Sequence, residues 1–158
     1  MSVHAWRIVK AKNAASAFTG EGARLWGGRW TSPGVPAVYV AGSISLAMLE
    51  MLVHLQAEEL LARYVLFEVT FEEAMAITVA PDSLPQTWRR SPPLSAIQRI
   101  GDEWITAGRS PVLRVPSVVV PSEYNYVLNP GHPGFTRITV GQRQPVRLDR
   151  RLLMGSSK

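Results

Sequence analysis

The apolar run at residues 44–55, ISLAMLEMLVHL, constrains the fold more than any other feature. A helix that is apolar almost all round is typical of a buried helix. Its single acid, Glu50, is therefore hard to place, because a carboxylate is rarely buried without a cation or hydrogen-bond donors. Ser43 precedes the run and is a favoured helix N-cap, so we expect a helix from there to about residue 62. Glu50 is then either one half of a structural ion pair, with Arg29 as the obvious partner, or part of a reaction centre.

Helical spacing gives this run one polar stripe. At about 100° per residue, Ser43, Ala47, Glu50 and His54 fall on the same side of the helix. Ala47 is small and leaves space beside Glu50. The stripe is therefore expected to line a cleft, although a groove open to solvent would fit the same pattern.

Length and composition indicate one domain of ordinary size. The chain has 158 residues, 46% of them apolar, which is enough for a single core. With no cysteine, disulfides and cysteine-ligated metals are excluded, and the three histidines lack metal-ligand spacing, so no metal site is expected. No apolar stretch is long enough to span a membrane, and the first residues lack the order of a secretory signal. We expect a cytoplasmic protein that does not associate with membranes.

The positive charge of the chain is spread out. The formal net charge is +5 and the pI is about 10.1, yet only 18% of residues are charged. The basic residues form no lysine-rich arm and no repeated basic–aromatic pattern. We interpret the excess mainly as solvated surface, with a nucleic acid or an acidic protein as the alternative partner.

Hydrophobic periodicity predicts an α+β fold. Besides the helix at 43–62, a second helix is expected at 95–107 and one helical turn at 14–18. Strands are expected at 4–9, 38–40, 64–71, 76–79, 112–115, 117–120, 136–140 and 146–148. Residues 122–134 are expected to be a long, turn-rich segment. Together these elements predict a single domain over residues 1–158, with a core at about 4–150, built on a small antiparallel or mixed sheet with a few helices.

Polar residues in the loops give further candidates. Arg29 follows two glycines, which suits an anion site, but a tight turn with a structural arginine fits equally. Tyr39 is either a core residue or an aromatic wall against a planar ring. Ser122 and Asn125 lie where a strand gives way to a loop, and there they are either binding groups or a polar turn. Arg7 is a weaker anion candidate on the first strand.

Known catalytic motifs are missing from the sequence. It contains no GxSxG elbow, no P-loop, no dinucleotide-binding glycine motif and no closely placed pair of acids. Trp26 and Trp30 are expected to serve packing. Any chemistry must therefore depend on a single carboxylate.

An ordered set of segments resembles the RES domain family, named for arginine, glutamate and serine residues. The resemblance covers residues 4–150. It rests on Trp6-Arg7, Phe18-Thr19-Gly20-Glu21-Gly22-Ala23, Gly27-Gly28-Arg29-Trp30, Pro36-Ala37-Val38-Tyr39, Leu46-Ala47-Met48-Leu49-Glu50 with His54, and Pro121-Ser122-Glu123-Tyr124-Asn125-Tyr126-Val127-Leu128-Asn129-Pro130.

The resemblance implies a function and a set of site residues. Members of the family are toxins of bacterial toxin–antitoxin pairs that break the nicotinamide–ribose bond of NAD+, with a fold like that of ADP-ribosyltransferases. Their antitoxin carries an Xre-type helix-turn-helix region and blocks the site, so nucleic acid is contacted only through the antitoxin. The naming positions fall on Arg29, Glu50 and Ser122, and Arg7, Tyr39 and Asn125 become substrate-binding companions.

The implied reaction also fits a lone carboxylate. Nicotinamide leaves NAD+ as a neutral molecule, so no general acid need protonate it. One carboxylate can stabilise the oxocarbenium-like transition state and orient water or phosphate. No cofactor is expected beyond NAD+ as substrate and inorganic phosphate as a candidate co-substrate. Hydrolysis and phosphorolysis both remain open, as does a homodimer within the antitoxin complex.

Two other functions remain in view. An ADP-ribosyltransferase would use the same fold and site but transfer ADP-ribose to a macromolecule. A non-catalytic RNA-binding domain would use the arginines near the C-terminus, and Glu50 would then have no role.

Overall fold

The computed structural model describes residues 1–56, 59 and 62–152. Over these residues the chain forms one curled sheet of eight strands. The strands are β1 (Ser2–Lys10), β2 (Val38–Ala41), β3 (Tyr64–Glu72), β4 (Ala76–Thr78), β5 (Val112–Pro116), β6 (Tyr124–Leu128), β7 (Thr139–Val140) and β8 (Gln144–Val146).

The α-helices are α1 (Glu21–Trp26), α2 (Ile44–Leu52) and α3 (Ser95–Ala107). Short 3-10 turns fill the connections: η1 (Ala11–Ser16), η3 (Glu73–Met75), η4 (Pro81–Ser83), η5 (Pro133–Arg137) and η6 (Arg150–Leu152). None of the described helices is long and apolar enough to span a bilayer.

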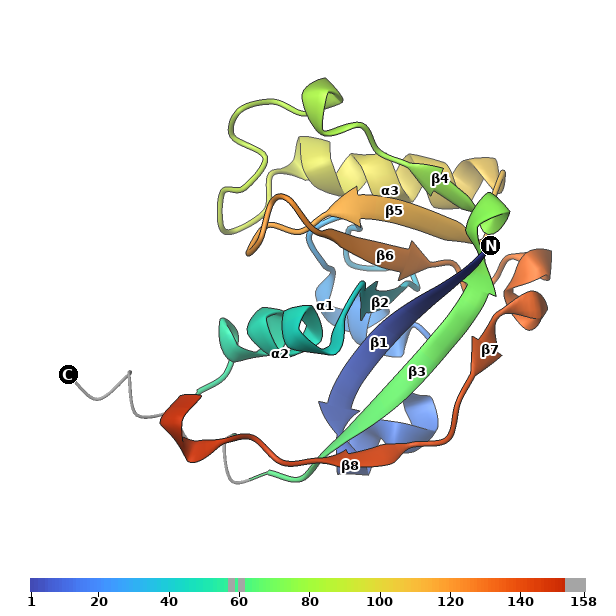
Figure 1. Ribbon diagram of the computed structural model, residues 1–158. Coiled ribbons are helices and arrows are strands. Elements are labelled where there is room, and N and C mark those ends of the chain that lie inside the picture. The colour runs from blue at the N-terminus through green and yellow to red at the C-terminus, as the bar shows by residue number, and fades with distance from the viewer. Residues whose placement is uncertain (57–58, 60–61, 153–158) are drawn as a thin grey trace.

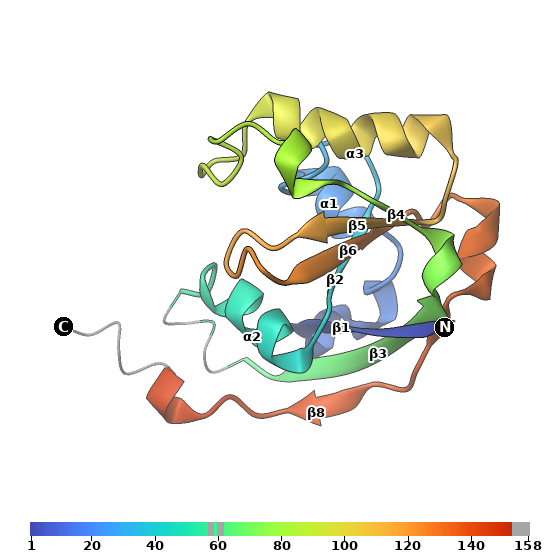
Figure 2. The ribbon, with the colours of Figure 1, turned by 45° about the horizontal axis from the view of Figure 1, so that its top comes forward.

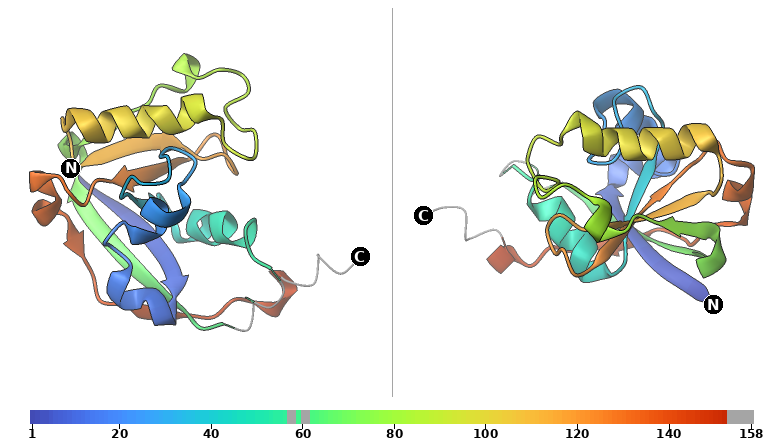
Figure 3. Two further views of the ribbon diagram at one scale, coloured as in Figure 1. Left: turned by 180° about the vertical axis from the view of Figure 1, so that it is seen from behind. Right: turned by 90° about the horizontal axis from the view of Figure 1, so that it is seen from above.

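The strand order β4-β5-β6-β2-β1-β3-β7 confirms the predicted mixed, mostly antiparallel sheet (Figure 1). β4 and β5 are parallel and the other pairs are antiparallel, with β8 also pairing with β3. α3 lies along β5 and β4, whereas α2 lies beside β1 on the other side of β6 (Figure 2). Seen from behind, α1 lies between α3 and η1 (Figure 3). The fold is therefore α+β, as predicted.

The sheet opens between β1 and β2. β1 pairs with β3 over its whole length, but only Trp6 and Ala41 are paired between β1 and β2. One core fills the inside of the curl and includes Val38, Val69 and Leu128. The open seam between the two halves of the sheet is where the site lies.

A second core packs α3 against the sheet. It includes Trp30, Ile97 and Trp104, and Gly101 lies directly against the Trp30 carbonyl. The Asp102 carboxylate accepts bonds from the Ser32 backbone N–H (2.9 Å) and hydroxyl (2.6 Å). These contacts fix the segment that follows Arg29. Trp30 packs as predicted, but the prediction for Trp26 was wrong, because its side chain is 83% exposed.

α2 is shorter and more exposed than predicted. Its N-cap is Ser43, as expected, and the Leu46 N–H donates to that hydroxyl over 3.0 Å. It ends at Leu52, well before residue 62, although residues 57, 58, 60 and 61 of the predicted span lie outside the described part. In the predicted helix Glu59 would lie near the C-terminus, where the negative end of the helix dipole disfavours an acid. Leu49 is 41% exposed, so the idea of a helix buried all round was wrong.

The region after β5 also differs from the prediction. Residues 117–120 were expected to be a strand but form a turn, because the Ser117 hydroxyl accepts bonds from the N–H groups of Val119 (3.1 Å) and Val120 (3.0 Å). Such local side-chain bonds compete with the ladder of a sheet. Residues 124–128, predicted to lie in a turn-rich segment, form β6, an interior strand of the sheet.

Candidate active site

A cleft of about 350 Å³ lies where β1 and β2 separate, and α2 forms its third wall. Three members of the predicted stripe, Ala47, Glu50 and His54, line it, whereas Ser43 is not among the lining residues. The other lining residues are Trp6, Arg7, Ile8, Val9, Lys10, Tyr39, Val40, Ala41, Met51, Leu55, Glu59, Tyr64 and Asn125. Four of the six residues singled out from the sequence, namely Arg7, Tyr39, Glu50 and Asn125, thus share one cleft.

Glu50 is half-buried and held by neutral donors. Its Oε1 accepts a bond from the Ser117 hydroxyl (2.7 Å) and another from the Asn125 side-chain amide (2.6 Å). Within the described residues, no Lys, Arg or His nitrogen lies within 4 Å of the carboxylate, and Oε2 has no hydrogen-bond partner. The structure therefore does not form the Arg29–Glu50 ion pair considered from the sequence. The carboxylate is oriented without being neutralised.

Ser117 connects the backbone of the turn after β5 to the Glu50 carboxylate. Its side chain is fully buried, and its hydroxyl accepts two backbone N–H groups while donating to the carboxylate. Its own N–H donates to the Glu123 carbonyl over 2.9 Å, which closes the turn between β5 and β6. Because both lone pairs of the hydroxyl accept backbone N–H groups, its proton is directed to the Glu50 carboxylate.

Asn125 lies on β6, opposite Ala41 and Val115. Its amide nitrogen donates to Glu50, which fixes the orientation of the side chain. Its Oδ1 is buried and has no hydrogen-bond partner among the described residues. A buried, unpaired carbonyl oxygen is uncommon and is often found at functional sites.

Arg7 spans the seam of the sheet. Its Nη1 donates to the Tyr39 carbonyl on β2 (2.8 Å), and its Nε donates to the Ala17 carbonyl (2.7 Å). Burial lowers the pKa of this guanidinium to about 10, so it remains a cation at neutral pH. Within the described residues it has no acidic partner within 4 Å. It is thus a half-buried positive charge on the cleft wall, suited to a ligand anion.

Tyr39 lines the cleft, and its hydroxyl points into the protein. The hydroxyl is bonded to that of Thr31 (2.7 Å) and accepts the Trp30 N–H (3.2 Å). Burial raises its pKa to about 12, so it stays neutral. A Cβ at Gly28 would run into this ring, which explains one of the two glycines before Arg29 by packing.

Arg29 is not among the described residues that line the cleft. Its Nη1 donates to the carbonyls of Arg90 (2.8 Å) and Trp88 (3.2 Å), and so anchors that loop. Burial lowers its pKa, while the negative charge of Glu50 raises it to a smaller extent. Arg29 therefore lies within electrostatic range of Glu50 but not in contact with it.

Ser122 does not reach Glu50. It is exposed in the loop before β6 and is not among the described residues lining the cleft. The serine that contacts the carboxylate is Ser117, five positions earlier, which sequence reasoning missed. The available signal was Pro116, which cannot donate to a sheet and so favours a turn at the next residue.

No group of three or more His, Asp or Glu side chains in the described residues is placed to hold a metal ion. The described cleft residues thus include one oriented carboxylate (Glu50), one half-buried cation (Arg7) and one tyrosine (Tyr39).

Comparison with known proteins gives a consistent family. A model of the RES domain matches residues 4–149. The chain belongs to the RES domain family. It is similar to "Toxin Res" of Yersinia enterocolitica, with 42% identity over 82% of this chain and 86% of the relative. "Toxin Res" of Photorhabdus laumondii is 40% identical over 94% of this chain and 96% of the relative.

Two further matches add detail. A RES-like relative from a Sphingobium species, 40% identical over 84% of this chain and 86% of the relative, is named "Prs ADP-ribosylating toxin". The fold is shared with a chain in the crystal structure of the M. tuberculosis MbcT–MbcA toxin–antitoxin complex. That match has a TM-score of 0.74 at 24% identity and covers 93% of this chain and 85% of the other.

Proposed function

We propose that this RES domain protein is the toxin of a bacterial toxin–antitoxin pair and that it degrades NAD+ by breaking the nicotinamide–ribose bond. The names of its relatives support the first part. The observation that supports the second is Glu50, a carboxylate oriented by Ser117 and Asn125 with no cation against it. We further propose that an antitoxin blocks the protein, since its structural neighbour comes from a toxin–antitoxin complex. An Xre-type antitoxin and a cytoplasmic site of action complete the proposal and rest on the family resemblance.

The proposed reaction needs one negative charge near the ribose. As the nicotinamide departs, positive charge develops on the ribose C1′ and ring oxygen, and Glu50 would stabilise it through its free Oε2. The Tyr39 ring would stack on a planar group, and Arg7 would hold a substrate phosphate. Ser117, rather than Ser122, would take the serine role by orienting Glu50. Arg29 would act at longer range by fixing the adjacent loop.

The products of the reaction identify the nucleophile, which is either water or inorganic phosphate. Purified protein is incubated with NAD+ in the presence and absence of inorganic phosphate, and the products are identified by mass. We expect nicotinamide in both cases, with ADP-ribose from hydrolysis or ADP-ribose-1″-phosphate from phosphorolysis. Unchanged NAD+ in both mixtures would contradict the proposal.

The second candidate is transfer of ADP-ribose to a macromolecule, which is favoured by the name of the Sphingobium relative. The same cleft and carboxylate would serve, with an acceptor side chain in place of water or phosphate. NAD+ labelled in its adenylate half separates the two functions. Label retained on protein after denaturation supports transfer, whereas label found only in small products supports degradation.

A further inference from the structure

A second cavity of about 410 Å³ adjoins the cleft at the end of β1. It is lined by Lys10, Ala11, Lys12, Glu59, Ala62 and Arg63, and we call it the basic basin. Lys10 and Glu59 line both the basin and the cleft, so the two spaces are neighbours. The basin lies beyond the C-terminal half of β1, away from Ser117 and Asn125.

Positive charge dominates the described wall of the basin. Lys10, Lys12 and Arg63 face one described carboxylate, Glu59, which pairs with Lys10 over 3.1 Å. Lys12 and Arg63 are exposed, and neither has an acidic side chain within 4 Å among the residues described. The basin is thus suited to an anion, whereas the opposite end of the cleft carries the Glu50 carboxylate.

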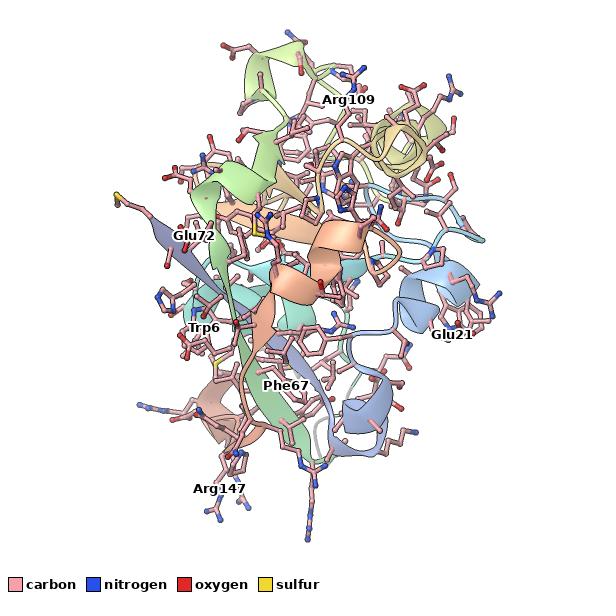
Figure 4. The ribbon with its side chains drawn as sticks, turned by 90° about the vertical axis from the view of Figure 1, so that its right-hand side faces the viewer. Trp6, Glu21, Phe67, Glu72, Arg109 and Arg147 are labelled. Carbon is pink, nitrogen blue, oxygen red and sulfur yellow. The ribbon has the colours of Figure 1, made fainter. Side chains whose placement is uncertain are left out.

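The sheet fixes the basin in place. Lys10 pairs with Tyr64 at the end of the β1–β3 ladder, and the Ala11 N–H donates to the Arg63 carbonyl over 2.8 Å. Tyr64 in turn pairs with Val146 on β8, which brings the next residue, Arg147, to the same end of the sheet. Figure 4 shows Arg147 at that end and Arg109 at the opposite end of the molecule.

The distance along β1 suits a dinucleotide. Lys10 lies three positions after Arg7, another cleft residue on β1, a span of about 10 Å. If the nicotinamide riboside end lies at Glu50 and Arg7 holds the first phosphate, the adenylate half must extend along this wall. We infer, resting on the proposed function, that the basic basin binds the phosphate-bearing adenylate end of NAD+.

The kinetic test removes charge from the basin without touching the cleft around Glu50. The double variant Lys12→Gln/Arg63→Gln is compared with Arg109→Gln, a matched loss of an exposed arginine elsewhere. An exposed charge contact changes affinity by about two- to fivefold, so the double variant should raise KM for NAD+ about five- to tenfold with kcat unchanged. Arg109→Gln should leave both constants unchanged.

A separate binding experiment tests this inference independently of the proposed function. ADP-ribose is titrated calorimetrically into Glu50→Gln protein, with and without the double change, so that no turnover is required. We expect the double change to weaken ADP-ribose binding by the same five- to tenfold ratio. If wild-type protein left NAD+ intact while this weakening was seen, the proposed function would fail and the basin would stand as a nucleotide site.

Three results would overturn the inference. One is unchanged ADP-ribose affinity in the double variant. Another is a comparable rise in KM for Arg109→Gln per charge removed, which would indicate a general effect of net charge. The third is a change confined to the dependence of the rate on inorganic phosphate, which would make the basin a co-substrate site.

Discussion

Glu50 is held by neutral partners rather than by a cation. A hydroxyl and an amide hold Oε1, whereas an arginine in contact would have cancelled much of the field that a cationic sugar needs. Removing one partner of a buried ion pair mainly destabilises a protein. A carboxylate held by dipoles can instead be changed to an amide with little loss of packing. The geometry therefore favours a reacting group over a structural ion pair.

The sequence predicted the cleft residues better than their partners. Glu50 could be singled out because an acid stood in an apolar run, Arg7 and Tyr39 because they lay on predicted strands, and Asn125 because it followed one. Ser117 could not, because it begins the run Ser117-Val118-Val119-Val120, whose β-branched residues favour a strand. Its role depends on a turn closed by its own hydroxyl, which a propensity argument does not reveal.

Exchanging the two serines for alanine should separate their roles. Ser117→Ala should lower kcat for NAD+ loss on the order of tenfold with KM nearly unchanged, because Glu50 loses an orienting bond while the binding surface stays. Ser122→Ala should behave like wild type. Steady-state kinetics on both folded variants checks this. A larger loss from Ser122→Ala would reverse the assignment.

Tyr39 predicts a pH dependence of stability. With its pKa raised from 10 to about 12, the unfolded chain ionises this phenol first, so stability is lost as pH rises above 10. At pH 11 the loss from this residue is about 1.4 kcal/mol. Tyr39→Phe should therefore lose less free energy of unfolding between pH 8 and pH 11 than wild type, as measured by denaturant titration. Equal losses in both proteins would contradict the assigned burial.

At the scale of elements, helical spacing proved more reliable than helix length. Ala47, Glu50 and His54 share the cleft although α2 ends at Leu52, since a stripe three or four residues apart needs only two or three turns. The exposure of Leu49 could not be foreseen, because apolar composition does not say which side of a helix meets the sheet. β6 was missed because the polar residues around it suggest a turn.

The packing of α3 also makes an element-scale prediction. A Cβ at Gly101 would collide with the Trp30 carbonyl, and a backbone atom cannot easily move aside. Gly101→Ala should lower the free energy of unfolding by about 3 kcal/mol and loosen the segment after Arg29. Gly22→Ala in α1 is the control, because nothing lies within 4 Å of its added methyl, and it should be neutral or stabilising by up to about 1 kcal/mol. Similar losses in both variants would rule out this contact as the cause.

For the whole molecule, the fold class followed from the alternation of strands and helices, but the seam in the sheet did not. The site exists because β1 and β2 part after a single pair and Arg7 bridges the gap to the Tyr39 carbonyl. Such an opening depends on pairing between segments far apart in sequence, and local patterns do not encode strand order. The uneven charge along this wall, acidic at Glu50 in the cleft and basic at Lys10 and Lys12 in the basin, likewise appears only once the chain is folded.

The most direct test of the central claim is nicotinamide release from NAD+ by Glu50→Gln protein shown to be folded by circular dichroism and thermal melting. The amide keeps the shape of the side chain and removes its charge. We expect the rate to fall about a hundredfold or more, the usual effect of losing one preorganised electrostatic group. Release at the wild-type rate by the folded variant would contradict the claim that this carboxylate carries the chemistry.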